Sequence, residues 1–346
     1  MSQVDVIIPC YNYGRFLAEC VTSILDGQGG ADVRVLIIDD ASQDDSAEIA
    51  QKFAATDSRV EVAVHPTNRG HIATFNEGLF EWANGDYCVL LSADDKLTPG
   101  ALGRAAAFMD EHPNVGLVYG HAVPIRPRRP HPSSRTRVWG TTIWPGQSWV
   151  ERRFRVADGC MSSPEVVVRT SLQHEVGEYD SRLPHTSDIE MWMRLALYSD
   201  VGYIRADQAY YRLHDSNMSN AYAAALPSLR ERRRAFEVLL EHHRDRLANA
   251  AKLCDIVRMQ LARQALWAAS HAYDSGRTDQ VPVEELIAFA FDCWPAANTL
   301  NSYRSLQLRR RIGPTLTPYL QPLNLYAPVR WARECMSLVQ WRLLGI

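Results

Sequence analysis

Alternation of strand-like and helix-like segments along residues 1–120 constrains the fold of this chain more than any other feature. Short runs rich in β-branched residues lie at 4–8, 33–38, 60–64, 87–91 and 115–119. Segments with helical spacing separate them, near 15–25, 44–55, 71–83 and 98–112. Strands that alternate with helices of this length predict βαβ units. We therefore expect an α/β domain with a mainly parallel sheet and helices on both faces.

The character of the chain changes after residue 121. Residues 125–137 contain five arginines and several prolines but no acidic residue, which predicts an extended loop rather than a helix. Two interpretations stay open for this part of the 121–165 insertion: a solvated loop, or a lid or contact for an anionic acceptor. Strand and helix signals return at 166–168, 189–198 and 201–204.

Strand signals nearly vanish after residue 225. Residues 228–273, 284–294 and 300–312 have the composition of helices. We expect an N-terminal α/β domain at 1–224 and a helical C-terminal domain at 225–346. The last residues are rich in arginine with Trp331 and Trp341 interleaved, which suits an interfacial helix on anionic lipid. The same pattern suits packing on the first domain or contact with a second copy in a homodimer.

Charge and cysteine usage exclude several classes of protein. The chain has 37 basic and 40 acidic residues, so it lacks the basic excess of a nucleic-acid-binding protein. No apolar run is long enough to cross a bilayer, and the first strand begins too near Met1 for a signal peptide. The seven cysteines form no Cys-x-x-Cys pair. The expected location is the cytoplasm, with the inner face of the cell membrane as a peripheral alternative.

Polar residues follow four of the predicted strands, where an open α/β sheet binds its ligands. They are Pro9 to Tyr13, Asp39 to Ser42, Asn68 to His71 and Ser92 to Asp95. Each acid pair alone would suit a helix cap or a turn. Two pairs at one sheet edge would repel each other, so we expect a divalent cation and a diphosphate between them. No Gly-rich phosphate loop is present, which disfavours P-loop kinases and Rossmann dehydrogenases.

These motifs, taken in order, resemble those of the family 2 glycosyltransferases with the GT-A fold. The resemblance covers residues 3–220 and rests on VIIPCYN, IIDDASQD, NRG and LSADD in the first half of that range. Further on, SPEVVVR at 163–169, SDIEMWMRL at 187–195 and YRLHDSNMS at 211–219 resemble the acceptor strand, the catalytic-base motif and the Arg-x-His segment. Ser92 and Ser187 depart from acids that the family usually has at these positions.

The resemblance implies roles for individual residues. Asp188 would be the catalytic base, with Glu190 as a second choice, and Asp95 and His214 would bind Mn²⁺ or Mg²⁺. The nucleotide sugar would be held by Pro9, Tyr11, Asn12, Asp39, Asp40, Arg69, Asn76 and Asp94. Among these, Tyr11 would stack on the base and Asp94 would reach the ribose.

The implied activity is inverting, metal-assisted transfer of a sugar from a nucleoside-diphosphate sugar, expected to be a UDP-sugar, to a hydroxyl acceptor. The expected acceptor is a carbohydrate or glycolipid of a cell-surface polysaccharide or glycoconjugate pathway. Transfer to a peptide, protein or small molecule is an alternative, as is a non-catalytic partner that only binds nucleotide sugars. A nucleotidylyltransferase is disfavoured because PCYNY replaces the Gly-rich loop that such an enzyme needs after its first strand.

Overall fold

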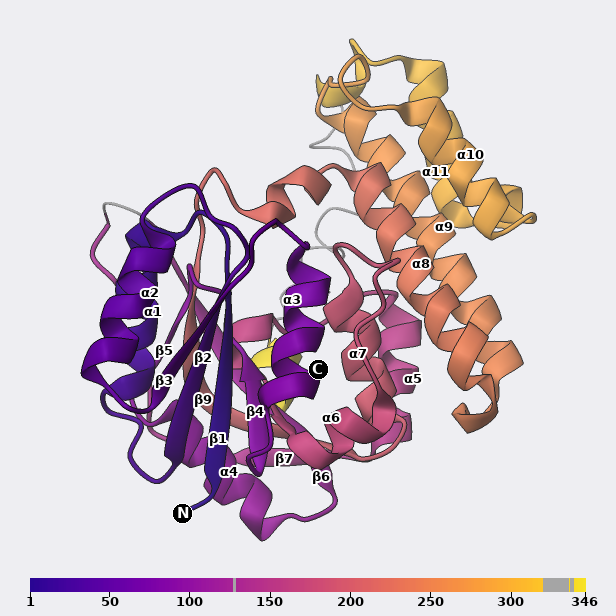
Figure 1. Ribbon diagram of the computed structural model, residues 1–346. Helices are drawn as coiled ribbons and strands as arrows, with labels where there is room; N and C mark the ends of the chain where they lie inside the picture. The colour runs from indigo at the N-terminus through magenta and orange to yellow at the C-terminus, as the bar shows by residue number, and fades with distance from the viewer. Residues whose placement is uncertain (127–128, 320–335, 337–338) are drawn as a thin grey trace. The chain divides into compact units, whose positions relative to one another are not determined.

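The computed structural model describes residues 1–126, 129–319, 336 and 339–346 (Figure 1). Contacts divide the chain into two compact units. The α/β unit comprises 1–149, 160–217 and 341–346, and the helical unit comprises 150–159 and 218–340, with the gaps just given. The predicted boundary after residue 224 lies directly before helix α8 (Ala225–His243), but the division by contacts falls at residue 217 instead and assigns residues 150–159 to the helical unit.

One sheet of nine strands forms the centre of the α/β unit. Its strands are β1 (Gln3–Cys10), β2 (Asp32–Asp39), β3 (Val60–Val64), β4 (Tyr87–Leu90), β5 (Lys96–Leu97), β6 (Val115–Ile125), β7 (Thr141–Trp144), β8 (Val167–Arg169) and β9 (Asp200–Arg212). Their spatial order is β3-β2-β1-β4-β8-β6-β9-β5, and β7 also pairs with β9. Neighbours from β3 to β4 are parallel, as are β6 and β9, whereas β8, β5 and β7 pair antiparallel.

Helices cover both faces of this sheet (Figure 1). They are α1 (Gly14–Leu25), α2 (Ser46–Thr56), α3 (His71–Glu77), the π-helical turn η1 (Gly78–Trp82), α4 (Ala101–Glu111), the short turn η2 (Ser163–Glu165), α6 (Thr170–Val176) and α7 (Ser187–Ala196). Helix α5 (Gly146–Val156) begins in this unit and continues into the helical unit.

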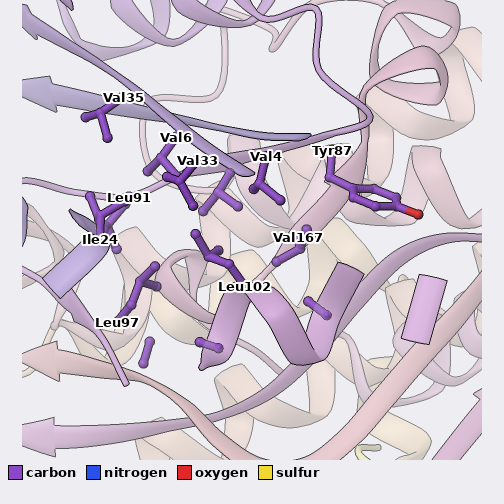
Figure 2. Close-up of a cluster of buried hydrophobic side chains, with 14 of the residues drawn as sticks. Val4, Val6, Ile24, Val33, Val35, Tyr87, Leu91, Leu97, Leu102 and Val167 are labelled. Atoms are coloured by element: carbon purple, nitrogen blue, oxygen red, sulfur yellow. The ribbon is translucent and has the colours of Figure 1, made fainter. Parts of the chain in front are cut away.

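Side-chain alternation along β1 explains why helices are needed on both faces. Val4, Val6 and Ile8 join the buried cluster that α1 and α4 complete, part of which Figure 2 shows. Ile7 points the other way, where a Cβ on Gly78 of η1 would come within 2.4 Å of it. Because both faces of β1 are buried, its sequence is nearly all apolar, as expected of a central parallel strand.

The predicted α/β class with a following helical region is confirmed. The five strands and four helices expected within residues 1–120 are all present, within a few residues of the expected bounds. Strands β5 and β7 and helix α5 were not predicted, because their sequences are short or strongly charged. Residues 129–139 form neither helix nor strand.

The last six residues of the chain are an integral part of the α/β unit. Tyr203 donates a hydrogen bond from its hydroxyl to the carbonyl of Arg342 at 2.8 Å, and Trp144 donates from Nε1 to the carbonyl of Leu344 at 2.8 Å. The indole of Trp341 donates to the carbonyl of Cys160 at 2.5 Å. These contacts tie the end of the chain to β7, β9 and the segment before η2.

The helical unit is built from α8, α9 (Ala250–Asp274), α10 (Val283–Cys293) and α11 (Asn301–Ile312), with the shorter turns η3 (Met218–Tyr222), η4 (Arg244–Arg246) and η5 (Ala297–Thr299). Phe154 of α5 packs against Phe236 of α8 with ring centroids 4.9 Å apart. Leucine and alanine side chains fill its core, including Leu239, Leu261 and Leu286.

No helix within the described ranges is both long enough and apolar enough to cross a membrane. The predicted basic amphipathic segment covers the last 46 residues, and its central part, at 320–335 and 337–338, lies outside the described residues. Its interpretation as a lipid-binding or packing helix stays a prediction.

Gly345 tests whether the end of the chain stabilises the α/β unit. Its φ is +78°, and a Cβ there would lie 2.5 Å from the Tyr203 ring. Gly27 has nearly the same φ, +76°, but its nearest atom would be 4.0 Å away. We expect Gly345→Ala to lower the free energy of unfolding by about 1–3 kcal/mol more than Gly27→Ala, because only the first overpacks a buried ring. Equal losses in chemical denaturation would contradict this role.

Candidate active site

Strands β1, β2 and β4 bring their carboxyl ends to one edge of the sheet. Cys10, the last residue of β1, is in register with Asp39, the last residue of β2. β4 lies on the other side of β1 and runs in the same direction, so residues 92–95 follow at the same edge. The polar residues predicted after these strands are therefore gathered where an α/β sheet binds its ligands.

Asp39 has one buried carboxylate oxygen without a hydrogen-bond partner among the described residues. Its side chain is 1% exposed. Oδ2 accepts a hydrogen bond from the backbone N–H of Ser42 at 3.0 Å, whereas the buried Oδ1 has no hydrogen-bond partner. A buried oxygen without a partner costs about 1–3 kcal/mol of stability. A donor group on a bound ligand would remove that cost.

The neighbouring Asp40 is occupied by the protein's own donors. Its carboxylate accepts from the backbone N–H groups of Arg69 at 2.7 Å and Gly70 at 2.9 Å, and it contacts Nδ1 of His65 at 2.7 Å. Burial would raise the pKa of Asp40, but these hydrogen bonds outweigh it, so the pKa lies below its usual value. Asp40 thus shapes the 65–70 turn, and the geometry favours Asp39 as the ligand-facing acid.

Two further candidates also serve the protein itself. Asn12, with φ of +58°, accepts from the backbone N–H of Gln43 at 2.7 Å. Asn76 binds the backbone of Tyr179 through both ends of its amide, at 3.0 and 2.8 Å. The Asn12 and Asn76 side chains therefore hydrogen-bond to backbone groups of the loops around the site.

Tyr11 and Arg69 remain accessible at the same edge. Tyr11 directly follows β1 and is 46% exposed, which leaves its ring available for stacking. Arg69 forms an ion pair with Glu77, and about half of its side chain is exposed. Pro9, in register with Ile38, is the next-to-last residue of β1.

Asp94 and His214 meet at this edge although 120 positions separate them in the chain. The His214 ring nitrogen Nε2 lies 2.9 Å from Oδ2 of Asp94, and both side chains are almost fully buried. The other ring nitrogen, Nδ1, lies 2.9 Å from the hydroxyl of Ser216. The ring also packs 5.0 Å from Phe16 of α1. Helix α1, the end of β4 and the end of β9 together fix its orientation.

Asp95 has a different environment from Asp94. It is 2% exposed, and its Oδ1 accepts a hydrogen bond from the backbone N–H of Arg212 at 2.7 Å. Burial, followed by the charge of Asp94, raises the pKa of Asp95 well above its usual value. Asp95 therefore anchors the end of β9 to the segment that follows β4. Asp94 is the acid that faces His214.

Sequence reasoning did not assign a role to Arg212. The structure places it in contact with the backbone of Asp94. Its Nε donates to the carbonyl of Asp94 at 2.6 Å, and its Nη2 donates to Glu19 at 2.6 Å. The guanidinium lies 4.7 Å from the centre of the Phe16 ring. The Arg-x-His spacing is the signal that could have identified it.

A divalent cation fits the Asp94–His214 pair if a substrate supplies further oxygens. Mg²⁺ and Mn²⁺ are commonly held by one or two carboxylates together with substrate phosphates. Within the part of the chain that the structure describes, no group of three or more potential ligands is arranged to hold a metal ion. A site completed by a diphosphate is consistent with both facts.

Asp188 lies in the first turn of α7 and is partly buried. Its Oδ2 is 3.5 Å from the Ser163 hydroxyl. Burial raises the pKa of Asp188 to about 6, against the opposing effect of its hydrogen bonds. A carboxylate with such a pKa can accept a proton near neutral pH more readily than an exposed aspartate.

Glu190, the second choice for the base, is paired within the protein. Both of its carboxylate oxygens accept from Arg194, at 3.1 and 2.6 Å, and both residues are buried. Arg194 also donates to the carbonyl of Val176 at 2.9 Å. This buried ion pair fixes α7, and the geometry favours Asp188 as the base.

Glu165 is a buried acid that sequence reasoning missed. It is 2% exposed, its Oε1 accepts from the backbone N–H of Ser162 at 3.0 Å, and its Oε2 has no hydrogen-bond partner. Burial raises the pKa of Glu165 to about 8, so the carboxyl group is mostly neutral at pH 7. An acid directly before three valines was the only sequence signal.

Comparison with known proteins identifies the family that the chain resembles. Residues 5–161 match the family described as Glycosyl transferase family 2. The glycosyltransferase GlyG of Streptococcus pneumoniae serotype 4 is 36% identical over 92 residues, which is 27% of this chain and 30% of GlyG. The chain spans between 28% and 43% of the length of three curated relatives that it matches.

Two solved structures share the fold. S. aureus TarS 1–349 in complex with UDP-GlcNAc has a TM-score of 0.61 at 20% identity, with 89% of this chain and 92% of that chain covered. The mannosyltransferase PcManGT from Pyrobaculum calidifontis, in complex with GDP-Man and Mn²⁺, has a TM-score of 0.55 at 15% identity. That comparison covers 92% of this chain and 88% of PcManGT. The GT-A-type fold expected from the sequence is confirmed.

The structural role of Asp40 can be tested by substitution. Asp40→Ala leaves two backbone N–H groups and His65 without their acceptor, so we expect a loss of about 2–4 kcal/mol in the free energy of unfolding. Asp26→Ala, at an exposed position after α1, should change it by less than about 0.5 kcal/mol. Denaturant unfolding measures both. A stable Asp40→Ala variant would show that Asp40 does not hold the 65–70 turn.

Proposed function

The chain belongs to the family 2 glycosyltransferases through its domain at residues 5–161, and from this premise we propose that it transfers a sugar from a nucleoside-diphosphate sugar to a hydroxyl acceptor. The observation that carries the proposal is the meeting of Asp94 and His214 at 2.9 Å, at the sheet edge that also bears Asp39. A carboxylate, an imidazole and an unsatisfied acceptor at one edge suit a nucleotide diphosphate with its cation.

The donor is proposed to be a UDP-sugar. The free Oδ1 of Asp39 can accept the N–H of a pyrimidine base, and the exposed ring of Tyr11 can stack on that base. Arg69 is near enough to the same turn to contact the base or the diphosphate. Pro9, Asn12, Asp40 and Asn76 would support the pocket by fixing its loops. UDP-GlcNAc in TarS is the comparison that favours uracil.

Mn²⁺ or Mg²⁺ is proposed to be held by Asp94 and His214 together with the diphosphate. When bound, the cation would neutralise the negative charge that develops on the leaving diphosphate. Asp94 fits this role better than Asp95, because the Asp95 carboxylate already accepts a hydrogen bond from the backbone N–H of Arg212. Arg212 positions Asp94 by donating a hydrogen bond from Nε to the backbone carbonyl of Asp94.

Asp188 is proposed to take the proton from the attacking hydroxyl. A single carboxylate base on the side opposite the leaving group gives one displacement, with inversion at the anomeric carbon. General-base catalysis of this kind contributes about 10²–10⁴-fold to a rate. The raised pKa of Asp188 makes it a stronger base than an exposed aspartate while it stays largely ionised above pH 7.

A carbohydrate or glycolipid on a cell-surface polysaccharide or glycoconjugate pathway is the proposed acceptor. Peptide, protein and small-molecule acceptors, and a partner that binds nucleotide sugars without turnover, are the alternatives. The partner alternative is disfavoured by the burial of Asp188, because a carboxylate whose pKa is raised to about 6 suits proton transfer.

Substitution of the proposed catalytic base, Asp188, separates turnover from donor binding. We expect Asp188→Asn to reduce transfer by at least about 100-fold, because an amide cannot accept the proton. Donor affinity, measured by calorimetry with UDP-GlcNAc and Mn²⁺, should stay within about threefold. Glu178→Gln, at an exposed position nearby, serves as the control and should retain full activity. Near-normal turnover of Asp188→Asn would reject the assignment.

The pH dependence of kcat provides an independent check. Only the ionised form of Asp188 can accept a proton, and its pKa is raised to about 6. With saturating donor and metal, kcat should be constant above pH 7 and should fall about tenfold per pH unit below pH 6. An acid limb near pH 4, typical of an exposed aspartate, would contradict the proposed base.

A further inference from the structure

A pocket of about 860 Å³ in the α/β unit is rich in arginine. Its lining includes Arg15 and Phe16 of α1, Arg126 and Arg129 of the loop after β6, and residues 213–216 after β9. The pairing of Ile125 with Arg212 explains this convergence, because the chain leaves β6 and β9 side by side. One acid, Asp215, also lines the pocket.

Arg126 and Arg129 are exposed and form no ion pair within the ranges that the structure describes. Arg135, in the same arginine-rich segment, instead donates to Asp207 through Nε and Nη2 at 3.2 and 3.0 Å. Arg137 lies over the Trp139 ring at 4.8 Å. In this segment, Arg135 and Arg137 therefore contact other parts of the fold, whereas Arg126 and Arg129 line the pocket.

Arg15 is the third cation of the pocket and is held in place. Its Nη2 donates to the Ser216 hydroxyl at 2.8 Å, and its guanidinium lies 4.6 Å from the centre of the Phe16 ring. Ser216 in turn contacts Nδ1 of His214. A positioned guanidinium loses less conformational freedom when it binds an anion than a freely moving one.

The pocket adjoins the proposed donor site but is distinct from it. His214 lies between them, with Nε2 directed to Asp94 and Nδ1 directed to Ser216, which lines the pocket. Asp39, Tyr11 and Asp94, which are proposed for the nucleotide and the cation, are not among the lining residues, whereas His214, the other proposed cation ligand, is. The arginines thus face a space next to the leaving group rather than the space for the nucleotide.

We infer that this pocket binds a phosphate group carried by the acceptor. Guanidinium groups bind phosphate oxygens through paired, charge-assisted hydrogen bonds, and three of them around one space suit a dianion. The enzyme would then act on a phosphate-bearing polyol or glycan chain. The inference that the phosphate belongs to the acceptor rests on the proposed function. The inference that the pocket binds phosphate does not depend on it.

Calorimetric titration with inorganic phosphate tests the pocket in the full chain. It is carried out at constant ionic strength, with and without saturating UDP and Mg²⁺, so that phosphate cannot enter the donor site when that site is filled. We expect saturable binding in both cases. Arg126→Gln/Arg129→Gln should weaken it by about tenfold or more, because two charge-assisted contacts are lost. The affinity for UDP should change by less than about twofold.

Arg137→Gln/Arg263→Gln is the matched control, since it removes two charges from exposed arginines that do not line the pocket. It should leave phosphate binding unchanged within about twofold. Three results would overturn the inference: no saturable binding of phosphate, an equal loss in the control, or a parallel loss of UDP affinity in the pocket variant. The last would assign these arginines to the donor diphosphate.

Donor turnover separates this inference from the proposed function. UDP release from UDP-GlcNAc is measured with glycerol 1-phosphate and with glycerol as minimal acceptors. We expect a KM at least about tenfold lower for glycerol 1-phosphate, and the Arg126→Gln/Arg129→Gln variant should lose that preference. Equal KM values would contradict a phosphate-bearing acceptor. Absence of UDP release under every condition, with phosphate binding intact, would count against the proposed function alone.

Discussion

Parallel pairing of β1 with both β2 and β4 is the constraint on which the rest of the α/β unit depends. The register of Cys10 with Asp39, and of Ile7 with Leu90, brings three strands to an end at one edge. Most side chains of these strands are buried, so the strands are largely apolar, and the charged Asp5 of β1 and Arg34 of β2 pair with each other. The same burial that makes the sheet stable therefore concentrates acids at its edge, and β9 completes the arrangement by bringing His214 to Asp94.

The acids at this edge divide into those that hold the fold and those that we propose face a ligand. Asp40 and Asp95 accept hydrogen bonds from backbone N–H groups of segments that come from elsewhere in the chain. Among the described residues, Asp39 keeps a buried oxygen without a hydrogen-bond partner, whereas the Asp94 carboxylate contacts the His214 ring and the Asn217 amide. Leaving the Asp39 oxygen unsatisfied costs stability. A buried acceptor without a partner can be satisfied by a bound ligand. The unsatisfied oxygen of Asp39 therefore suits a ligand-binding role.

The sequence predicted the fold, and it predicts the location of the site, because both predictions follow from local signals. Runs such as 33–38 show strand periodicity directly, and the polar residues after them mark the strand ends. The division of labour within each acid pair could not be predicted in this way. Whether Asp94 or Asp95 faces His214 depends on the backbone of Arg212, which is more than a hundred residues away. The same holds for the docking of Trp341 against Cys160 and for the burial of Glu165.

A crystal structure with UDP-GlcNAc and Mn²⁺, with anomalous scattering used to locate the metal, tests the central claim most directly. The account predicts a manganese peak bound by Asp94, His214 and the diphosphate, with the uracil stacked on Tyr11 and hydrogen-bonded to Oδ1 of Asp39. A metal bound by Asp95 instead, or a nucleotide located away from the ends of β1 and β2, would contradict it.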